Sequence, residues 1–164
     1  MHKKLKLYID IDGVLLTAKN TKPADHAVDF IDFITEDYDC FWLTTHCKGD
    51  ASHAIRYLQP YFGKNTIDKL SAIKSTNWDT LKTEGIDLSS KFLWLDDCPF
   101  NSEKAVLAKN NCLDSLIIVD LNRPDELRRV LEILKNSTNR KSWWRQMTRP
   151  FSWFRTLFGG NKSK

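Results

Sequence analysis

The sequence contains no run of apolar residues close to the roughly 20 that cross a membrane. It also lacks the uncharged stretch of about 7–15 apolar residues found in secretory signals, because lysines and then Asp10 and Asp12 interrupt its first segment. The four cysteines form no C-x-x-C pair and no metal-ligand spacing. We therefore expect a cytoplasmic protein whose thiols are reduced.

Acidic residues are absent from position 133 to the end of the chain, where eight of the 25 basic residues lie. The part before it holds 17 basic and 21 acidic side chains, so the two parts carry opposite net charge. With 28% charged and 41% apolar residues, the chain is typical of a soluble globular protein with one full core. The charge pattern predicts a domain over residues 1–135 and a separate tail over residues 136–164.

The predicted tail combines arginines and lysines with aromatic residues, including Trp143, Trp144 and Trp153. This mixture suits the surface of an anionic membrane, which would place the protein peripherally at the inner membrane surface. It also suits nucleic acid, where aromatic rings stack on bases and cations contact phosphates. A third interpretation is that the aromatic residues pack on the domain or on a partner subunit.

Strands and helices alternate along the domain. Apolar runs predict strands at residues 5–11, 40–44, 91–95 and 115–119, and helical spacing predicts helices at 24–36, 51–59, 79–85, 102–109 and from 124 onward. Between positions 60 and 80 the pattern fits either a minimal strand at Thr66 and Ile67 or a short helix lined by Ile67, Leu70 and Ile73. Strands that are almost wholly apolar indicate an α/β fold with a mostly parallel sheet covered on both faces.

Polar side chains follow three of these strands, namely Asp10 and Asp12, then Thr44, then Asp96 and Asp97. In parallel sheets the ligand site lies at the carboxyl ends of the strands, so these residues are expected to meet at one edge. Asp10 and Asp12 have the i, i+2 spacing that places two side chains on one side of a strand. Two neighbouring carboxylates need a cation, a proton or a charged substrate.

Phosphoryl transfer from a phosphomonoester uses such a set of groups. Asp10 is placed as a nucleophile, and Asp12 as the acid and base that serves the leaving oxygen and the attacking water. Thr44 offers a hydroxyl to a phosphoryl oxygen, and Asp96 and Asp97 offer oxygen ligands to magnesium. A lysine is also needed to neutralise the phosphoryl group.

The sequence resembles the haloacid dehalogenase superfamily of aspartate-nucleophile phosphohydrolases. Asp10-Ile-Asp12-Gly13-Val14 is similar to its first motif, Leu43-Thr44 to its second, and the segment 93–97, with Asp96-Asp97, to its fourth. The resemblance implies a Rossmann-like three-layer sandwich and an aspartyl-phosphate intermediate. It also implies Mg²⁺ held by the Asp10 side chain, the Asp12 backbone carbonyl and the Asp96/Asp97 pair, with Asp97 as the direct ligand.

The third motif of that family is a lysine that opens the helix before the last motif strand. Lys82 fits this position best, and Lys74 is the next choice among candidates that also include Lys64 and Lys69. His46 lies two residues after Thr44, where it is either a substrate contact or an ordinary loop residue.

Family members often carry a cap domain after the first motif or between the second and third motifs. Here both intervals are short, which predicts a capless, Mg²⁺-dependent phosphatase whose open site suits an accessible phosphate. Its substrate would be a phosphoprotein, a nucleic-acid end or a small phosphomonoester. The alternative is a non-catalytic module that recognises phosphate or acts as a scaffold recruited through the tail.

Overall fold

A computed structural model of the chain describes residues 4–138. Within this range the fold is α/β, with a four-stranded, all-parallel sheet and five α-helices, as predicted. The strands are β1 (Lys6–Ile9), β2 (Asp39–Trp42), β3 (Phe92–Asp96) and β4 (Leu116–Ile118), in the spatial order β2-β1-β3-β4. Their apolar runs fill the core: Leu7, Tyr8 and Ile9 of the central strand are at most 2% exposed.

The register of the sheet determines which residues meet at its carboxyl edge. Ile9 of β1 pairs with Trp42 of β2 and with Leu95 of β3. Asp10 therefore lies level with Asp96, and its backbone N–H donates to the Leu95 carbonyl at 3.1 Å.

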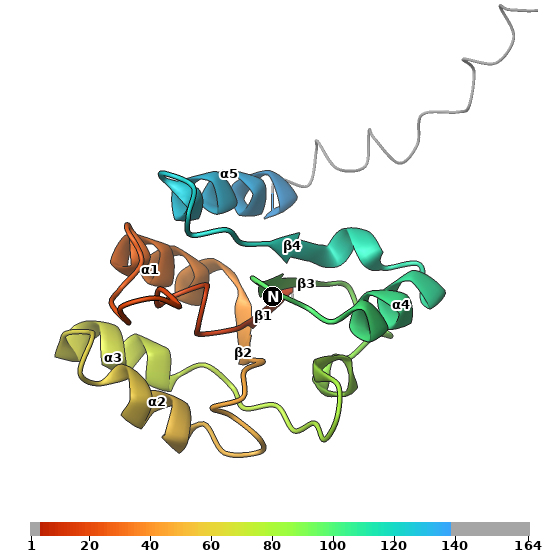
Figure 1. Ribbon diagram of the computed structural model, residues 1–164, viewed down its shortest axis with the longest axis horizontal. Coiled ribbons are helices and arrows are strands. Elements are labelled where there is room, and N and C mark those ends of the chain that lie inside the picture. The colour runs from red at the N-terminus through yellow and green to blue at the C-terminus, as the bar shows by residue number, and fades with distance from the viewer. Residues whose placement is uncertain (1–3, 139–164) are drawn as a thin grey trace, which may run out of the picture. The chain divides into compact units, whose positions relative to one another are not determined.

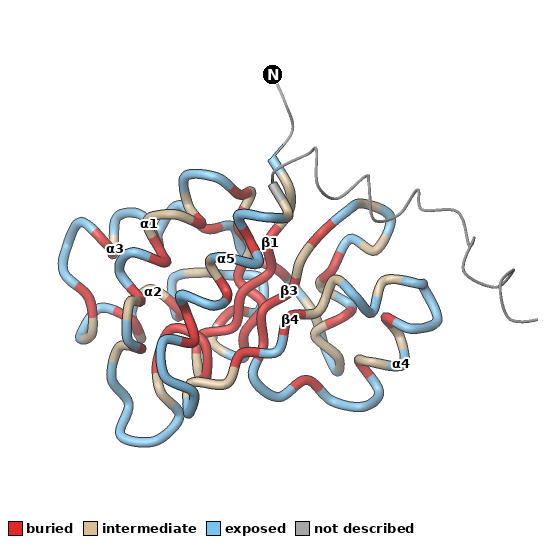
Figure 2. Tube along the Cα trace, turned by 90° about the horizontal axis from the view of Figure 1, so that it is seen from above, coloured by how far each residue is buried: buried red, intermediate tan, exposed pale blue. Residues whose placement is uncertain are grey.

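The α-helices are α1 (Ala27–Asp37), α2 (Ser52–Leu58), α3 (Lys64–Ser71), α4 (Asn101–Lys109) and α5 (Glu126–Thr138). Two short 3₁₀ helices, η1 (Lys82–Gly85) and η2 (Leu113–Ser115), precede β3 and β4. Figures 1 and 2 both place α1, α2 and α3 on one side of the strands and α4 on the other. Helix α1 contacts β2 and packs on α3, and η1 packs on α4, so helices lie on both sides of the sheet.

Two local predictions differ from the structure. The minimal strand at Thr66 and Ile67 is wrong, because both residues lie in helix α3. The helix predicted at 79–85 is reduced to the single turn η1, where the Glu84 carboxylate accepts hydrogen bonds from the backbone N–H groups of residues 79–81 and holds them outside the helix.

The interval between β1 and α1 is a loop. The interval between β2 and β3 contains α2, α3 and η1. Within residues 4–138, neither interval contains a cap domain. No helix in this range combines the length and the apolar character needed to cross a bilayer.

The compact unit that contains the four strands ends at Leu131. The boundary predicted after Lys135 falls inside α5. From position 139 onward, the tail predicted for residues 136–164 lies outside the described residues.

Candidate active site

Three aspartates form an acidic cluster at the carboxyl edge of the sheet. Asp10 directly follows β1, Asp96 is the last residue of β3, and Asp97 comes next in the chain. One carboxylate oxygen from each lies within 4.8 Å of the other two, so the group could hold a metal ion. Asp10 and Asp96 are buried, whereas Asp97 is exposed, which leaves one side of the cluster open to solvent.

Gly13 makes room for this cluster. Its φ of +74° lies in the left-handed region, where residues with a Cβ are strained. An ideal Cβ at this position would also overlap the Asp97 carboxyl group. The glycine is therefore required twice, by the turn after β1 and by the close approach of Asp97.

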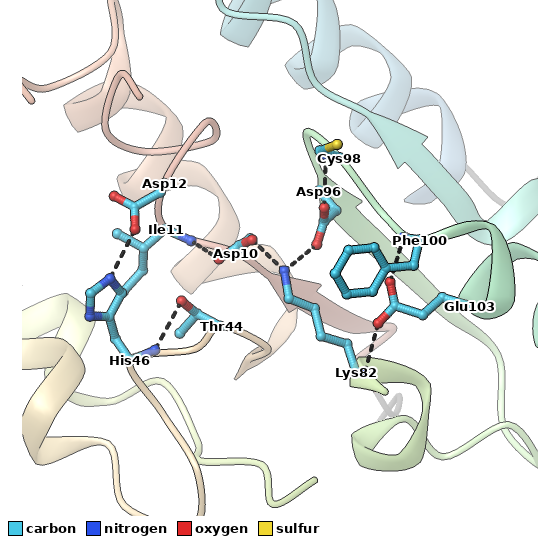
Figure 3. Close-up of polar contacts among 10 residues, drawn as sticks. All are labelled: Asp10, Ile11, Asp12, Thr44, His46, Lys82, Asp96, Cys98, Phe100 and Glu103. Carbon is cyan, nitrogen blue, oxygen red and sulfur yellow. Dashed lines mark hydrogen bonds and ion pairs between the residues drawn. The ribbon is translucent and has the colours of Figure 1, made fainter. Parts of the chain in front are cut away.

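Lys82 is the cation that contacts the acidic cluster. It opens η1, and its amine pairs with Asp10 and, at 2.6 Å, with Asp96 (Figure 3). Burial alone lowers the pKa of Lys82, but the two carboxylates raise it by more, so its pKa lies above the ordinary value and the amine is charged at neutral pH.

The other candidate lysines lie elsewhere. Lys74 pairs with Asp39 at 2.6 Å, Lys69 pairs with Asp32 at 2.7 Å, and Lys64 is the first residue of α3. Among the described residues, Lys82 is therefore the lysine whose position matches the requirement for a neutralising amine.

The acidic cluster has three carboxyl groups but only one neighbouring lysine amine among the described residues. Burial and then Asp10 raise the pKa of Asp96, even though Lys82 and the Cys98 backbone N–H oppose that shift. Burial and then Asp96 raise the pKa of Asp97. Three carboxylates facing one amine fit a divalent cation, because an added cation would relieve their repulsion.

Asp12 has different partners from Asp10. The sheet pairing of β1 ends at Ile9, so the alternation expected for i, i+2 residues of a strand does not extend to Asp12. Its carboxylate lies 2.9 Å from His46 Nε2 through one oxygen and accepts a 2.9 Å hydrogen bond from the Tyr57 hydroxyl through the other. Figure 3 shows Asp12 beside His46, on the opposite side of Asp10 from Lys82.

Thr44 lies where a hydroxyl is needed, two residues after the end of β2, and it is fully buried. Its oxygen faces the backbone N–H of His46 at 3.4 Å. Asp10 is oriented locally, because its second oxygen accepts a 2.7 Å hydrogen bond from the Ile11 N–H. The structure thus brings Asp10, Thr44, Lys82, Asp96 and Asp97 to one edge and turns the Asp12 carboxylate toward His46.

Sequence reasoning missed two residues that support this site. Tyr57 lies on α2, where the apolar spacing that predicts the helix carries no information about its polar side chains. Glu103 is buried in the first turn of α4, where its two oxygens accept 2.8 Å hydrogen bonds from the backbone N–H groups of Lys82 and Phe100 (Figure 3). A glutamate three residues after a helix start is a capping signal, but nothing in the pattern points to Lys82 as a second partner.

Comparison with known proteins identifies no relative of this chain: no protein-family model matches it, and neither does any curated protein sequence.

Proposed function

We propose that this protein is a Mg²⁺-dependent phosphomonoester hydrolase that acts through an aspartyl-phosphate on Asp10. The observation that carries the proposal is the difference in surroundings between two carboxylates that lie two residues apart. Asp10 is buried next to a charged lysine and two further carboxylates, whereas Asp12 is half-exposed and, among the described residues, has His46 and Tyr57 as its side-chain partners. Carboxylates in such different surroundings suit different roles in one reaction. The motif resemblance to haloacid dehalogenases supports the same assignment.

Asp10, Asp96 and Asp97 are the side chains that would hold the Mg²⁺ ion, with the Asp12 carbonyl as a further oxygen ligand. When bound, the ion supplies positive charge that offsets the negative charge of the phosphoryl oxygens. Lys82 adds a fixed cation beside Asp10, and the Thr44 hydroxyl donates to a phosphoryl oxygen. These groups allow an anionic nucleophile to approach an anionic substrate.

In the first step, an Asp10 oxygen attacks phosphorus and the bond from phosphorus to the leaving oxygen breaks. The electron pair goes to the leaving oxygen, which takes a proton from the Asp12 carboxylic acid and departs as an alcohol. In the second step, water attacks phosphorus while the Asp12 carboxylate takes a proton from it. The bond to Asp10 breaks, phosphate is released, and both aspartates return to their starting states.

The absence of a cap in residues 4–138 bears on the substrate. An open edge does not exclude water from a small molecule on all sides, so the substrate must shield the site itself or be held by a partner. We therefore propose an accessible phosphate, such as one on a macromolecule, as the substrate class.

The test is phosphate release from p-nitrophenyl phosphate by the full chain. We expect turnover with Mg²⁺, none with excess EDTA, and a loss of at least about 10³-fold in Asp10→Asn, because that amide is not a nucleophile. A panel of phosphopeptides, 3′- and 5′-phosphorylated oligonucleotides and sugar phosphates then identifies the substrate class. If wild type and Asp10→Asn are equally inert on every member of the panel, the phosphatase proposal is rejected in favour of a phosphate-binding module.

A further inference from the structure

The Asp12 carboxylate is held at both oxygens by two side chains from different elements. His46 lies in the loop after β2, and Tyr57 lies on α2. Both contacts measure 2.9 Å, so each is a hydrogen bond of ordinary length. Among the described residues, these two are the side-chain partners of Asp12.

His46 and Tyr57 also contact each other. The rings of His46 and Tyr57 stack with their centroids 3.9 Å apart and their planes 12° apart. The ring centroids of Tyr57 and Tyr61 lie 6.1 Å apart with the planes 67° apart, which is an edge-on arrangement. Stacked rings restrict the side-chain rotations of both residues, so the hydroxyl and Nε2 are presented to Asp12 as a unit.

The arrangement leaves Asp12 able to react. An ionised carboxylate has about four lone-pair positions, and these two hydrogen bonds use one on each oxygen. Nε2 must carry its hydrogen to donate to an ionised Asp12. The Asp12 side chain remains 42% exposed, so its free lone pairs are open to substrate. The carboxylate is thus fixed in orientation without being covered.

We propose that His46 and Tyr57 are positioning residues that orient Asp12 as the general acid and base of the reaction. This inference rests on the proposed phosphatase function and goes beyond it by assigning roles to two residues outside the motifs. Orientation matters for a proton transfer, because the donor must lie within hydrogen-bond reach of the leaving oxygen as the phosphorus–oxygen bond breaks. The competing explanation is that the pair only attaches α2 to the loop after β1.

The two explanations differ in how they depend on the leaving group. An aryl oxygen such as p-nitrophenolate departs readily without a proton, whereas an alkyl oxygen departs only if it is protonated. Residues that act through the general acid must therefore matter more for an alkyl phosphate than for an aryl phosphate. A residue that only anchors a helix affects both substrates equally.

The experiment compares kcat/KM for p-nitrophenyl phosphate and β-glycerophosphate with Mg²⁺, since kcat/KM reports the step in which the leaving group departs. Tyr57→Phe keeps the stacked ring and removes only the hydroxyl. We expect it to lose about tenfold on the alkyl phosphate and less than about threefold on the aryl phosphate. Tyr61→Phe, which removes a neighbouring hydroxyl outside the Asp12 contacts, is the matched control and should leave both values unchanged.

His46 provides an independent test. His46→Gln retains an N–H donor at a similar reach but cannot stack, whereas His46→Leu retains neither. If His46 positions Asp12, Gln should preserve most of the alkyl-phosphate activity that Leu loses. Circular dichroism and the thermal midpoint show whether each variant is folded, and the Gln and Leu pair keeps the test valid if Tyr57→Phe is unstable.

Equal losses on the two substrates, or no losses, would overturn the positioning role while leaving the phosphatase intact. Failure of the proposed function looks different, because wild type would then release no phosphate from either substrate or from any member of the substrate panel described above. In that case both proposals are rejected.

Discussion

Gly13 shows how a single backbone position shapes the candidate site. It has φ +74° in the turn after β1, and the Asp97 carboxyl group fills the space that a Cβ would need. Gly49 also has positive φ, +84°, but its nearest neighbour to an added Cβ is Asn77 Oδ1 at 3.6 Å, an ordinary contact distance. The two glycines therefore share the backbone requirement, and only Gly13 also has the close approach.

This difference predicts distinct outcomes for Gly13→Ala and Gly49→Ala. Left-handed backbone strain costs each variant about 1–2 kcal/mol of unfolding free energy. Gly13→Ala must lose more, because the new methyl group displaces Asp97 from the acidic cluster. Urea unfolding measures the free energies, and a Mg²⁺ titration should show weaker binding in Gly13→Ala alone. Equal stability losses with equal Mg²⁺ affinity would contradict the proposed contact with Asp97.

At the scale of elements, Glu103 connects η1 to α4. Its two oxygens accept hydrogen bonds from the backbone N–H groups of Lys82 and Phe100, both at 2.8 Å, and it is 2% exposed. A buried carboxylate with two backbone donors fixes where η1 begins. Because Lys82 is the first residue of η1, Glu103 also determines where the amine reaches Asp10.

Glu103→Ala is expected to destabilise the protein by about 2–3 kcal/mol, because two backbone N–H groups lose their acceptor in a buried place. Glu84 is the matched control: it accepts hydrogen bonds from the N–H groups of residues 79–81, but it is exposed, so water can replace it. Glu84→Ala should therefore lose less stability in urea unfolding. The proposed phosphatase activity should also fall in Glu103→Ala, since Lys82 is released from its place. Equal stability losses in the two variants would show that burial does not decide the effect.

At the scale of the whole molecule, the acidic cluster predicts that stability depends on a bound cation. The pKa values of Asp96 and Asp97 are raised, first by burial and then by neighbouring carboxylates. A carboxyl group whose pKa is raised by folding opposes folding once it is ionised, so the contribution is unfavourable at neutral pH. A divalent ion that binds only the folded state should therefore stabilise the protein.

We expect Mg²⁺ to raise the thermal midpoint and EDTA to reverse the change. At about 100 times the dissociation constant, one site contributes about 2.7 kcal/mol. Asp97→Asn should remove most of the Mg²⁺ effect without lowering the metal-free midpoint, because it also removes repulsion. Asp114→Asn, at an exposed acid on η2, is the control that should retain the effect. A midpoint that rises equally in both variants would place the ion elsewhere.

Local patterns in the sequence determined the parallel sheet and the edge where the site lies. Apolar runs that end at Asp10, Thr44 and Asp96 predict buried strands, and parallel strands bring their carboxyl ends to one edge. These features depend on residues close together in the chain. The secondary structure of residues 60–80 is ambiguous in the sequence, because the short apolar pattern fits a helix or a strand equally well. In the structure, helix α3 of this segment packs on α1.

Only the tertiary structure decided which side chains form hydrogen bonds or ion pairs with each aspartate. The sequence ranks Lys82 ahead of Lys74, but whether the Lys82 amine reaches Asp10 depends on where η1 begins, and that depends on Glu103, which lies 21 positions away. The Tyr57 hydroxyl reaches Asp12 across 45 positions of chain. A hydrogen bond between distant residues leaves no periodic signal, because helix spacing records which face is apolar and not what the polar face contacts. The strands and the aspartates that follow them are thus set locally, whereas the partners of those aspartates are set by packing.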